Sequence, residues 1–192
     1  MSTTEPAPAT TTERRKPRVA TAHLTGCFGC HMSLLDIDEQ IFDLVELIDF
    51  DASPINDFKR LSGPVDVGLV EGGCSSDDHV EVLRHFRQHC GTLISVGACA
   101  LTGGVPSMRN VVPLRECLEE AFLHGPTVVD GVIPHDPDLP ELLDRVYPCH
   151  EVVQIDLMLP GCPPPAEAFW NTISALLTGK EIDMPYTAFK YD

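Results

Sequence analysis

Short apolar runs that alternate with helical segments most restrict the fold of this chain. Five such runs, rich in β-branched residues and bounded by glycine or proline, predict strands at residues 18–24, 46–50, 65–70, 92–96 and 152–159. The spacing of apolar residues predicts helices over 32–45, 78–89, 114–123, 139–146 and 166–177. This alternation predicts an α/β fold, a flavodoxin-like doubly wound parallel sheet with strand order 2-1-3-4-5.

The length and composition predict a single domain. With 192 residues, 43% of them hydrophobic, the chain is long enough to bury a core without disulfide bonds. Residues 1–17, rich in threonine, alanine and proline, are expected to be a flexible tail before a domain at 18–192. No run approaches the roughly 20 apolar residues of a membrane-spanning helix, so no membrane contact is expected.

Charge and cysteine content restrict the partners and the compartment. A net charge of −16 disfavours nucleic acid, because phosphate binding needs clustered lysine and arginine. The pair Arg14 and Arg15 lacks the apolar segment that follows it in an export signal. We therefore expect a cytoplasmic protein, in which the eight cysteines are thiols or metal ligands.

The position of each cysteine relative to the predicted strands separates candidate ligands from other cysteines. Ligands of a doubly wound sheet bind outside the carboxyl ends of its strands. Cysteines in glycine-rich surroundings follow strands at five positions, Cys27, Cys30, Cys74, Cys99 and Cys162. The remaining three precede strands, at the opposite edge, or lie within a predicted helix; these are Cys90, Cys149 and Cys117.

The pair Cys27 and Cys30 forms a C-x-x-C motif that fits three kinds of site. A thioredoxin-like dithiol needs no further cysteines at the same edge, and structural zinc usually takes two close pairs. One pair combined with isolated cysteines far along the chain favours an iron–sulfur cluster held by loops of a large fold. A zinc protein or an FMN-binding flavodoxin-like protein remains the alternative, because the fold alone does not define function.

Four motifs, GCFGCHMSLLDIDE, VEGG, GACALTGG and PGCPPP, together resemble the small subunit of nickel–iron hydrogenases of the NAD-reducing type. The resemblance covers roughly residues 18–177. It implies one 4Fe-4S cluster on Cys27, Cys30, Cys99 and Cys162. Cys74 matches no ligand of that family and is expected next to the ligands or at a subunit interface. A single cluster is implied because no cysteine follows Cys162. The related 20 kDa subunit of complex I is the second interpretation, since it carries adjacent cysteines in place of C-x-x-C.

The resemblance also implies a role and partners. The chain would be a subunit of a hydrogen:NAD oxidoreductase, with no catalytic residue of its own. Electrons would pass between a nickel–iron centre in a separate large subunit and a diaphorase module that carries FMN and further clusters. The large subunit is expected to cover residues 26–35, 71–74 and 99–104. Whether this chain also binds FMN is left open.

Several polar residues near these motifs allow two interpretations each. Glu71, at the end of a predicted strand, is expected to serve the interface or a proton relay rather than to be a solvated carboxylate. His31, directly after Cys30, either donates an N–H toward a cluster sulfur or an interface, or is a polar residue at a helix start. His79 is expected at a solvated helix start, and residues 36–39 are expected on a polar helix face rather than at a carboxylate metal site.

Overall fold

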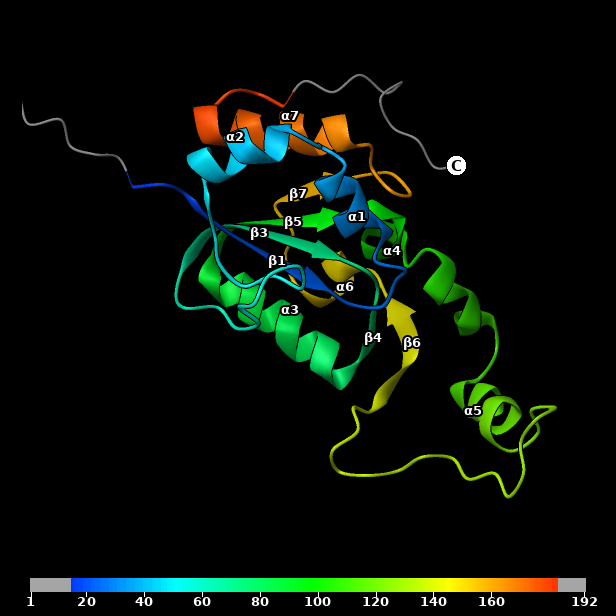
Figure 1. Cartoon of the computed structure of the whole chain (residues 1–192). Helices are drawn as coiled ribbons and strands as arrows, with labels where there is room; N and C mark the ends of the chain where they lie inside the picture. Colours follow the sequence, from blue (N-terminus) through cyan, green and yellow to red (C-terminus); the bar gives the residue numbers. More distant parts are fainter. Residues whose placement is uncertain (1–14, 183–192) are drawn as a thin grey trace, which may run out of the picture.

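A five-stranded parallel sheet forms the centre of the computed structural model, which describes residues 15–182 (Figure 1). The strands are β1 (Arg18–His23), β2 (Asp49–Phe50), β3 (Val65–Glu71), β5 (Cys90–Val96) and β7 (Leu157–Leu159). Their spatial order is β2-β1-β3-β5-β7, with parallel pairing throughout. This is the predicted flavodoxin-like order, so the fold class is confirmed.

Helices cover both faces of the sheet (Figure 1). One face carries α1 (Gly29–Leu35), α2 (Gln40–Leu47) and α7 (Ala166–Thr178), and the other carries α3 (Asp77–His89) and α6 (Cys149–Val152). Neighbouring strand residues supply the two cores alternately, because successive side chains of a strand point to opposite faces. Leu69 and Ile94 pack toward α1 and α7, whereas Val70 and Leu93 pack toward α3.

The connection between β5 and β7 departs from the prediction. It contains α4 (Gly97–Thr102), the 3₁₀ helix η1 (Val105–Val111), α5 (Leu114–Phe122) and strand β6 (Leu142–Tyr147). The predicted helix at 139–146 is wrong, because this segment pairs antiparallel with β4 (Cys74–Ser76). A strand here gives the exposed edge of β4 a hydrogen-bonding partner. The predicted strand at 152–159 is shorter, since α6 occupies its beginning.

The predicted helix at 32–45 is divided into α1 and α2. Asp38 adopts a positive φ of 56°, which a continuing helix excludes. Residues 36–39 therefore form the turn between the two helices, and their expected place on a helix face is wrong. The register of α2 buries Leu44 and leaves Phe42 71% exposed. Because α2 continues to Leu47, β2 begins only at Asp49.

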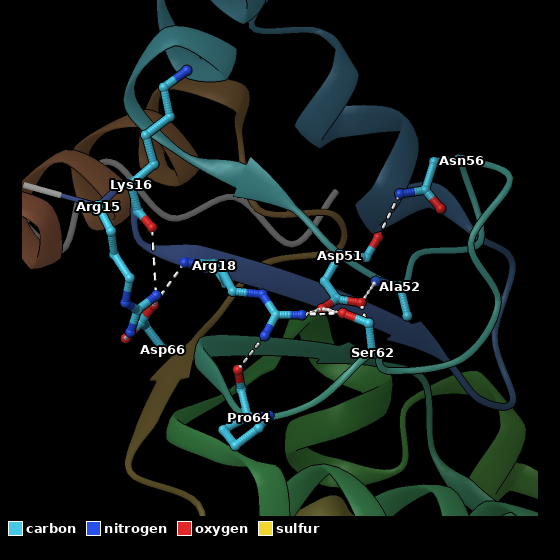
Figure 2. Close-up of polar contacts among 9 residues, drawn as sticks. All are labelled: Arg15, Lys16, Arg18, Asp51, Ala52, Asn56, Ser62, Pro64 and Asp66. Carbon is cyan, nitrogen blue, oxygen red and sulfur yellow. Dashed lines mark hydrogen bonds and ion pairs between the residues drawn. The ribbon is translucent and has the colours of Figure 1, made fainter.

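Figure 2 shows a polar network that anchors β1 and the connection from β2 to β3. The Asp51 carboxylate is 4% exposed and accepts hydrogen bonds from the Arg18 guanidinium, from Ser62 Oγ at 2.9 Å and from the Ala52 amide at 2.8 Å. Burial opposes ionisation of Asp51, but the Ser62 hydrogen bonds and the Arg18 charge outweigh it and hold its pKa below the ordinary value. Arg15 pairs with the more exposed Asp66 at 2.9 Å.

Replacing Asp51 with Asn is expected to destabilise the chain by about 2–3 kcal/mol, because charge-assisted hydrogen bonds to a buried carboxylate are lost. Since its folded pKa is lowered, ionised Asp51 contributes this stability above about pH 4, where the unfolded carboxyl is also ionised. The difference between native chain and variant should shrink as the pH falls below that value. Urea unfolding at several pH values measures this difference in the free energy of unfolding. Asp66→Asn is the control, with an expected loss below about 1 kcal/mol.

The first described residues contact the domain through charged side chains. Residues 1–14 of the expected tail lie outside the described residues, and Arg15 of that tail pairs with Asp66. Lys16 Nζ then donates to the Val45 carbonyl at 2.9 Å. Within residues 15–182, every helix is too short or too polar to cross a membrane.

Candidate metal centre

Four cysteines from three connections line one cavity of about 70 Å³ outside the carboxyl ends of the strands. Cys27 lies in the turn after β1, and Cys30 lies in the first turn of the α1 helix that follows. Cys99 lies on α4, directly after β5, and Cys162 lies in the loop after β7. The fold thus brings together residues that are 135 positions apart, from 27 to 162.

The surroundings of the sulfurs favour binding of a positively charged group. Cys27 and Cys162 are exposed, and Cys30 and Cys99 are half-buried. Burial, followed by the charge of Glu71, raises the pKa of Cys30 far above its ordinary value. Burial and the proximity of Cys162 and Cys27 also raise the pKa of Cys99. Several thiolates this close repel one another, and bound metal relieves that repulsion.

Glycine backbone approaches the sulfurs where a side chain has no space. A Cβ atom added to Gly97, which has a φ of +80°, would overlap Cys30 Sγ. A Cβ on Gly104 would lie 2.8 Å from Cys99 Sγ, and one on Gly29 would lie 3.1 Å from Cys27 Sγ. Only glycine combines this positive φ with so close an approach. The cavity is therefore bordered by backbone, as a bulky inorganic group requires.

The spacing of the sulfurs can be compared with the spacing that a single metal ion requires. A tetrahedral zinc site with Zn–S bonds of about 2.3 Å holds its sulfurs about 3.8 Å apart. Within residues 15–182, His23, His31 and Glu71 form the one group of three or more potential ligands whose atoms all lie within 4.8 Å of one another. No three of the four cysteine sulfurs lie that close to one another, so the described residues do not hold them at the spacing of an assembled tetrahedral zinc site.

Glu71 ends β3 beside the cavity and is only 3% exposed, so a solvated carboxylate is excluded. Its Oε1 lies 2.6 Å from His23 Nδ1 and 3.0 Å from His31 Nδ1, and its Oε2 accepts the His31 amide at 3.0 Å. Burial opposes ionisation, but the hydrogen bonds and charges of His31 and His23 outweigh it and lower the pKa of Glu71. This carboxylate therefore fixes the chain on both sides of the C-x-x-C turn.

The ring of His31 does not face the cysteine sulfurs. It is buried, and its Nε2 lies 2.8 Å from Thr21 Oγ1, while Nδ1 lies next to Glu71. The prediction of an N–H directed at a cluster sulfur is wrong for the ring, because Nε2 faces Thr21 of β1 and Nδ1 lies 3.0 Å from the Glu71 carboxylate of β3, without hydrogen-bond geometry. Sequence reasoning missed His23, although its place as the last residue of β1 puts it at the same edge.

The other four cysteines do not line the cavity. Cys74 is fully buried in β4, and burial raises its pKa to about 11. Cys149 was expected at the opposite edge, and this is wrong: it begins α6, and its Sγ lies 3.4 Å from the Gly72 carbonyl at the carboxyl edge. The error arose because a strand was predicted to begin at residue 152, which would put Cys149 just before that strand, at the opposite edge. Cys90 is buried at the start of β5, and Cys117 is half-buried on α5.

Two further expectations about exposure are corrected. His79 is half-buried rather than solvated, with Nδ1 3.3 Å from Thr25 Oγ1, and burial lowers its pKa. Residues 71–74 were expected under a partner, but the chain itself buries them. A Cβ on Gly73 would lie 2.7 Å from Val146 of β6, so that strand covers this turn. Of the three segments expected under a partner, only residues 26–35 and 99–104 have exposed residues.

A flavodoxin-like domain that gathers four cysteines at one edge is matched by a known family. Residues 27–176 fit the family described as NADH ubiquinone oxidoreductase, 20 Kd subunit, and the chain belongs to this family. It is 46% identical over 180 residues to the NAD-reducing hydrogenase HoxS subunit delta of Cupriavidus necator, covering 92% of this chain and 86% of that protein. The predicted resemblance to a hydrogenase small subunit is thereby confirmed.

Other relatives are hydrogenase subunits as well. A subunit of the F420-non-reducing hydrogenase of Methanothermobacter thermautotrophicus is 40% identical over 176 residues, and the match spans 90% of this chain but 57% of that protein. One chain in the crystal structure of NAD+-reducing [NiFe]-hydrogenase in the H2-reduced state superposes with a TM-score of 0.90 and 45% identity. That match covers 93% of this chain and 100% of the other.

Proposed function

We propose that this chain is the electron-transfer small subunit of an NAD-reducing nickel–iron hydrogenase. In this proposal Cys27, Cys30, Cys99 and Cys162 hold one 4Fe-4S cluster. The observation that carries it is the one cavity that these four cysteines line together. When bound, such a cluster supplies one-electron transfer at a potential set by its ligands and surroundings.

The residues around the four cysteines hold the proposed ligands in position without a bound cluster. The glycines at 29, 97 and 104 let backbone approach the sulfurs. Glu71 accepts the His31 amide at 3.0 Å, which fixes the first turn of α1 and with it the neighbouring Cys30. Cys30 and Cys99 are half-buried, so their sulfurs are partly shielded from water. Fixed ligands and limited solvent access are the means by which a protein holds a cluster and tunes it.

The proposal includes partners and a compartment. A large subunit that carries the nickel–iron centre covers residues 26–35 and 99–104, where Cys27 and Cys99 lie beside exposed surface. A diaphorase module with FMN and further clusters receives the electrons and passes them to NAD. The domain at residues 18–192 is thus the iron–sulfur cluster-binding unit. A cytoplasmic location is supported by the eight cysteines, all of which are free thiols in the structure.

The test is metal analysis of the complex purified without oxygen. Roughly four iron and four sulfide per small subunit are expected, together with brown visible absorption and hydrogen-dependent reduction of NAD. Two iron per chain, or zinc, would refute the proposed cluster. A yellow flavin spectrum without iron would favour the FMN-binding alternative. A cluster without hydrogen-dependent activity, in a complex that reacts with quinone, would favour the complex I alternative.

A further inference from the structure

A long excursion leaves the sheet after Cys99 and returns before Cys149, and we call residues 104–145 the arm. It contains η1, α5, the connection 123–141 and the beginning of β6. Figure 1 shows α5 and this connection extending away from the sheet and from the helices that cover it. All residues of the arm are described, and none of them is buried.

Large apolar side chains nevertheless occur along the whole arm. Val111, Val129 and Val132 are 86%, 85% and 75% exposed. Further exposed apolar side chains of the arm are Val105, Met108, Val112, Phe122, Leu123, Leu139 and Leu142. Single exposed apolar residues are ordinary, but a succession of them along one segment is typical of an interaction surface.

The arm's own domain covers little of its apolar surface. Its helix α5 has nine residues and none is buried, whereas an isolated helix needs roughly 12–15 residues to be stable in water. Ordering a backbone costs conformational entropy, which buried apolar surface usually offsets. Polar contacts join the arm to β6, because Arg109 donates to the Leu143 carbonyl at 2.8 Å and Asn110 donates to the Val146 carbonyl at 2.9 Å, and the Leu143 side chain packs against the core. Burial of the exposed apolar side chains of the arm therefore requires the surface of a partner.

The arm starts beside a cavity cysteine, and its last residue precedes a strand residue at the same edge of the sheet. Gly104 lies against Cys99, since a Cβ added to it would be 2.8 Å from the sulfur. At the other end, Val146 lies over Gly73, two residues after Glu71. The arm thus continues directly from residues 99–104, the part of the edge that faces the large subunit in the proposed function.

The charge of the arm indicates the chemistry of the surface that it meets. Acidic side chains outnumber basic ones, and the acidic residues are Glu116, Glu119, Glu120, Asp130, Asp136, Asp138, Glu141 and Asp144. Of the three arginines, Arg109 is engaged by carbonyls of the arm itself and Arg115 pairs with Glu119 at 2.7 Å. A complementary surface is apolar and bordered by lysine and arginine.

We propose that the arm docks on the nickel–iron large subunit, on an apolar surface with a basic border. The inference rests on the proposed function and adds the element that makes the contact. Docking of the arm then also covers the adjoining cluster edge, because the first residues of the arm lie next to Cys99.

The experiment compares arm variants with a matched control in the complex with the large subunit. Val111→Asp and Val129→Asp place a charge where no residue of this chain is packed, so the domain should fold unchanged. Each is expected to weaken binding of the large subunit by about 30-fold, measured by sedimentation. Phe42→Asp is the matched control, because Phe42 is likewise a highly exposed apolar side chain, at 71%, but lies on α2 outside the arm. It is expected to leave the affinity for the large subunit unchanged. Amide hydrogen exchange at residues 105–132 should slow when the large subunit binds.

Three results would overturn the docking role: unchanged affinity in both arm variants, an equal loss in Phe42→Asp, or exchange that slows only through self-association or through the diaphorase. Iron content, measured on the same preparations, separates this proposal from the proposed function. Absence of iron from the unmodified complex would refute the cluster. Normal iron content, with unaltered binding of the large subunit by the arm variants, would refute docking by the arm and leave the proposed cluster standing.

Discussion

Replacement of Cys99 by Ser is expected to abolish most of the iron and visible absorption of the complex, whereas Cys74→Ser should retain them. Both cysteines follow a strand in glycine-rich sequence, which makes them a matched pair. Cys99 lines the cavity with the other proposed ligands, but Cys74 is fully buried in β4. A serine hydroxyl stays protonated at neutral pH and is a poor substitute for a thiolate ligand.

Iron per chain, from metal analysis, measures the outcome: a fall from roughly four to below two is expected for Cys99→Ser. Cys74→Ser buries a hydroxyl in an apolar site, so it should lower stability by about 1–3 kcal/mol at full iron content. Comparable iron loss in both variants, with both folded by circular dichroism, would show that the assignment of ligands is wrong.

Replacement of Gly97 by Ala is expected to reduce cluster content nearly as strongly, although no ligand is removed. The added Cβ would overlap Cys30 Sγ, so the sulfur must move away from the cavity. The positive φ of +80° adds strain of about 1 kcal/mol for any residue with a Cβ. Displacement of one ligand by even a small distance weakens a site whose geometry is fixed by its surroundings.

Gly179→Ala is the control because it separates strain from overlap. Gly179 ends α7 with a φ of +66°, and an added Cβ would meet nothing within 4 Å. It should cost a similar amount of backbone strain and leave iron content unchanged. Iron per chain and thermal unfolding of both variants give the comparison. Full iron content in Gly97→Ala would show that the close approach of the Gly97 backbone to Cys30 is not needed for cluster binding.

The sequence by itself determined the sheet and the residues at its carboxyl edge. Alternating strands and helices have few topologies, because parallel strands need crossover connections and the crossovers are right-handed. The strand order therefore followed from the pattern. In such a sheet the end of every strand reaches the same edge, so the positions of Cys27, Cys99 and Cys162 relative to their strands sufficed to place them together.

Only the tertiary structure decided the features that depend on contacts between distant segments. Residues 139–146 have apolar spacing that suits a helix, but pairing with β4 made them a strand, and the position of Cys149 changed with it. Glu71, His23 and His31 come from different segments, and burial of their polar atoms became visible only when β1, β3 and α1 were packed. The arm is a further example. The local sequence predicts helix α5, but the exposure of the apolar side chains of the arm depends on where the rest of the fold lies. Periodicity records which way a side chain points, whereas what it meets depends on residues far away in the chain.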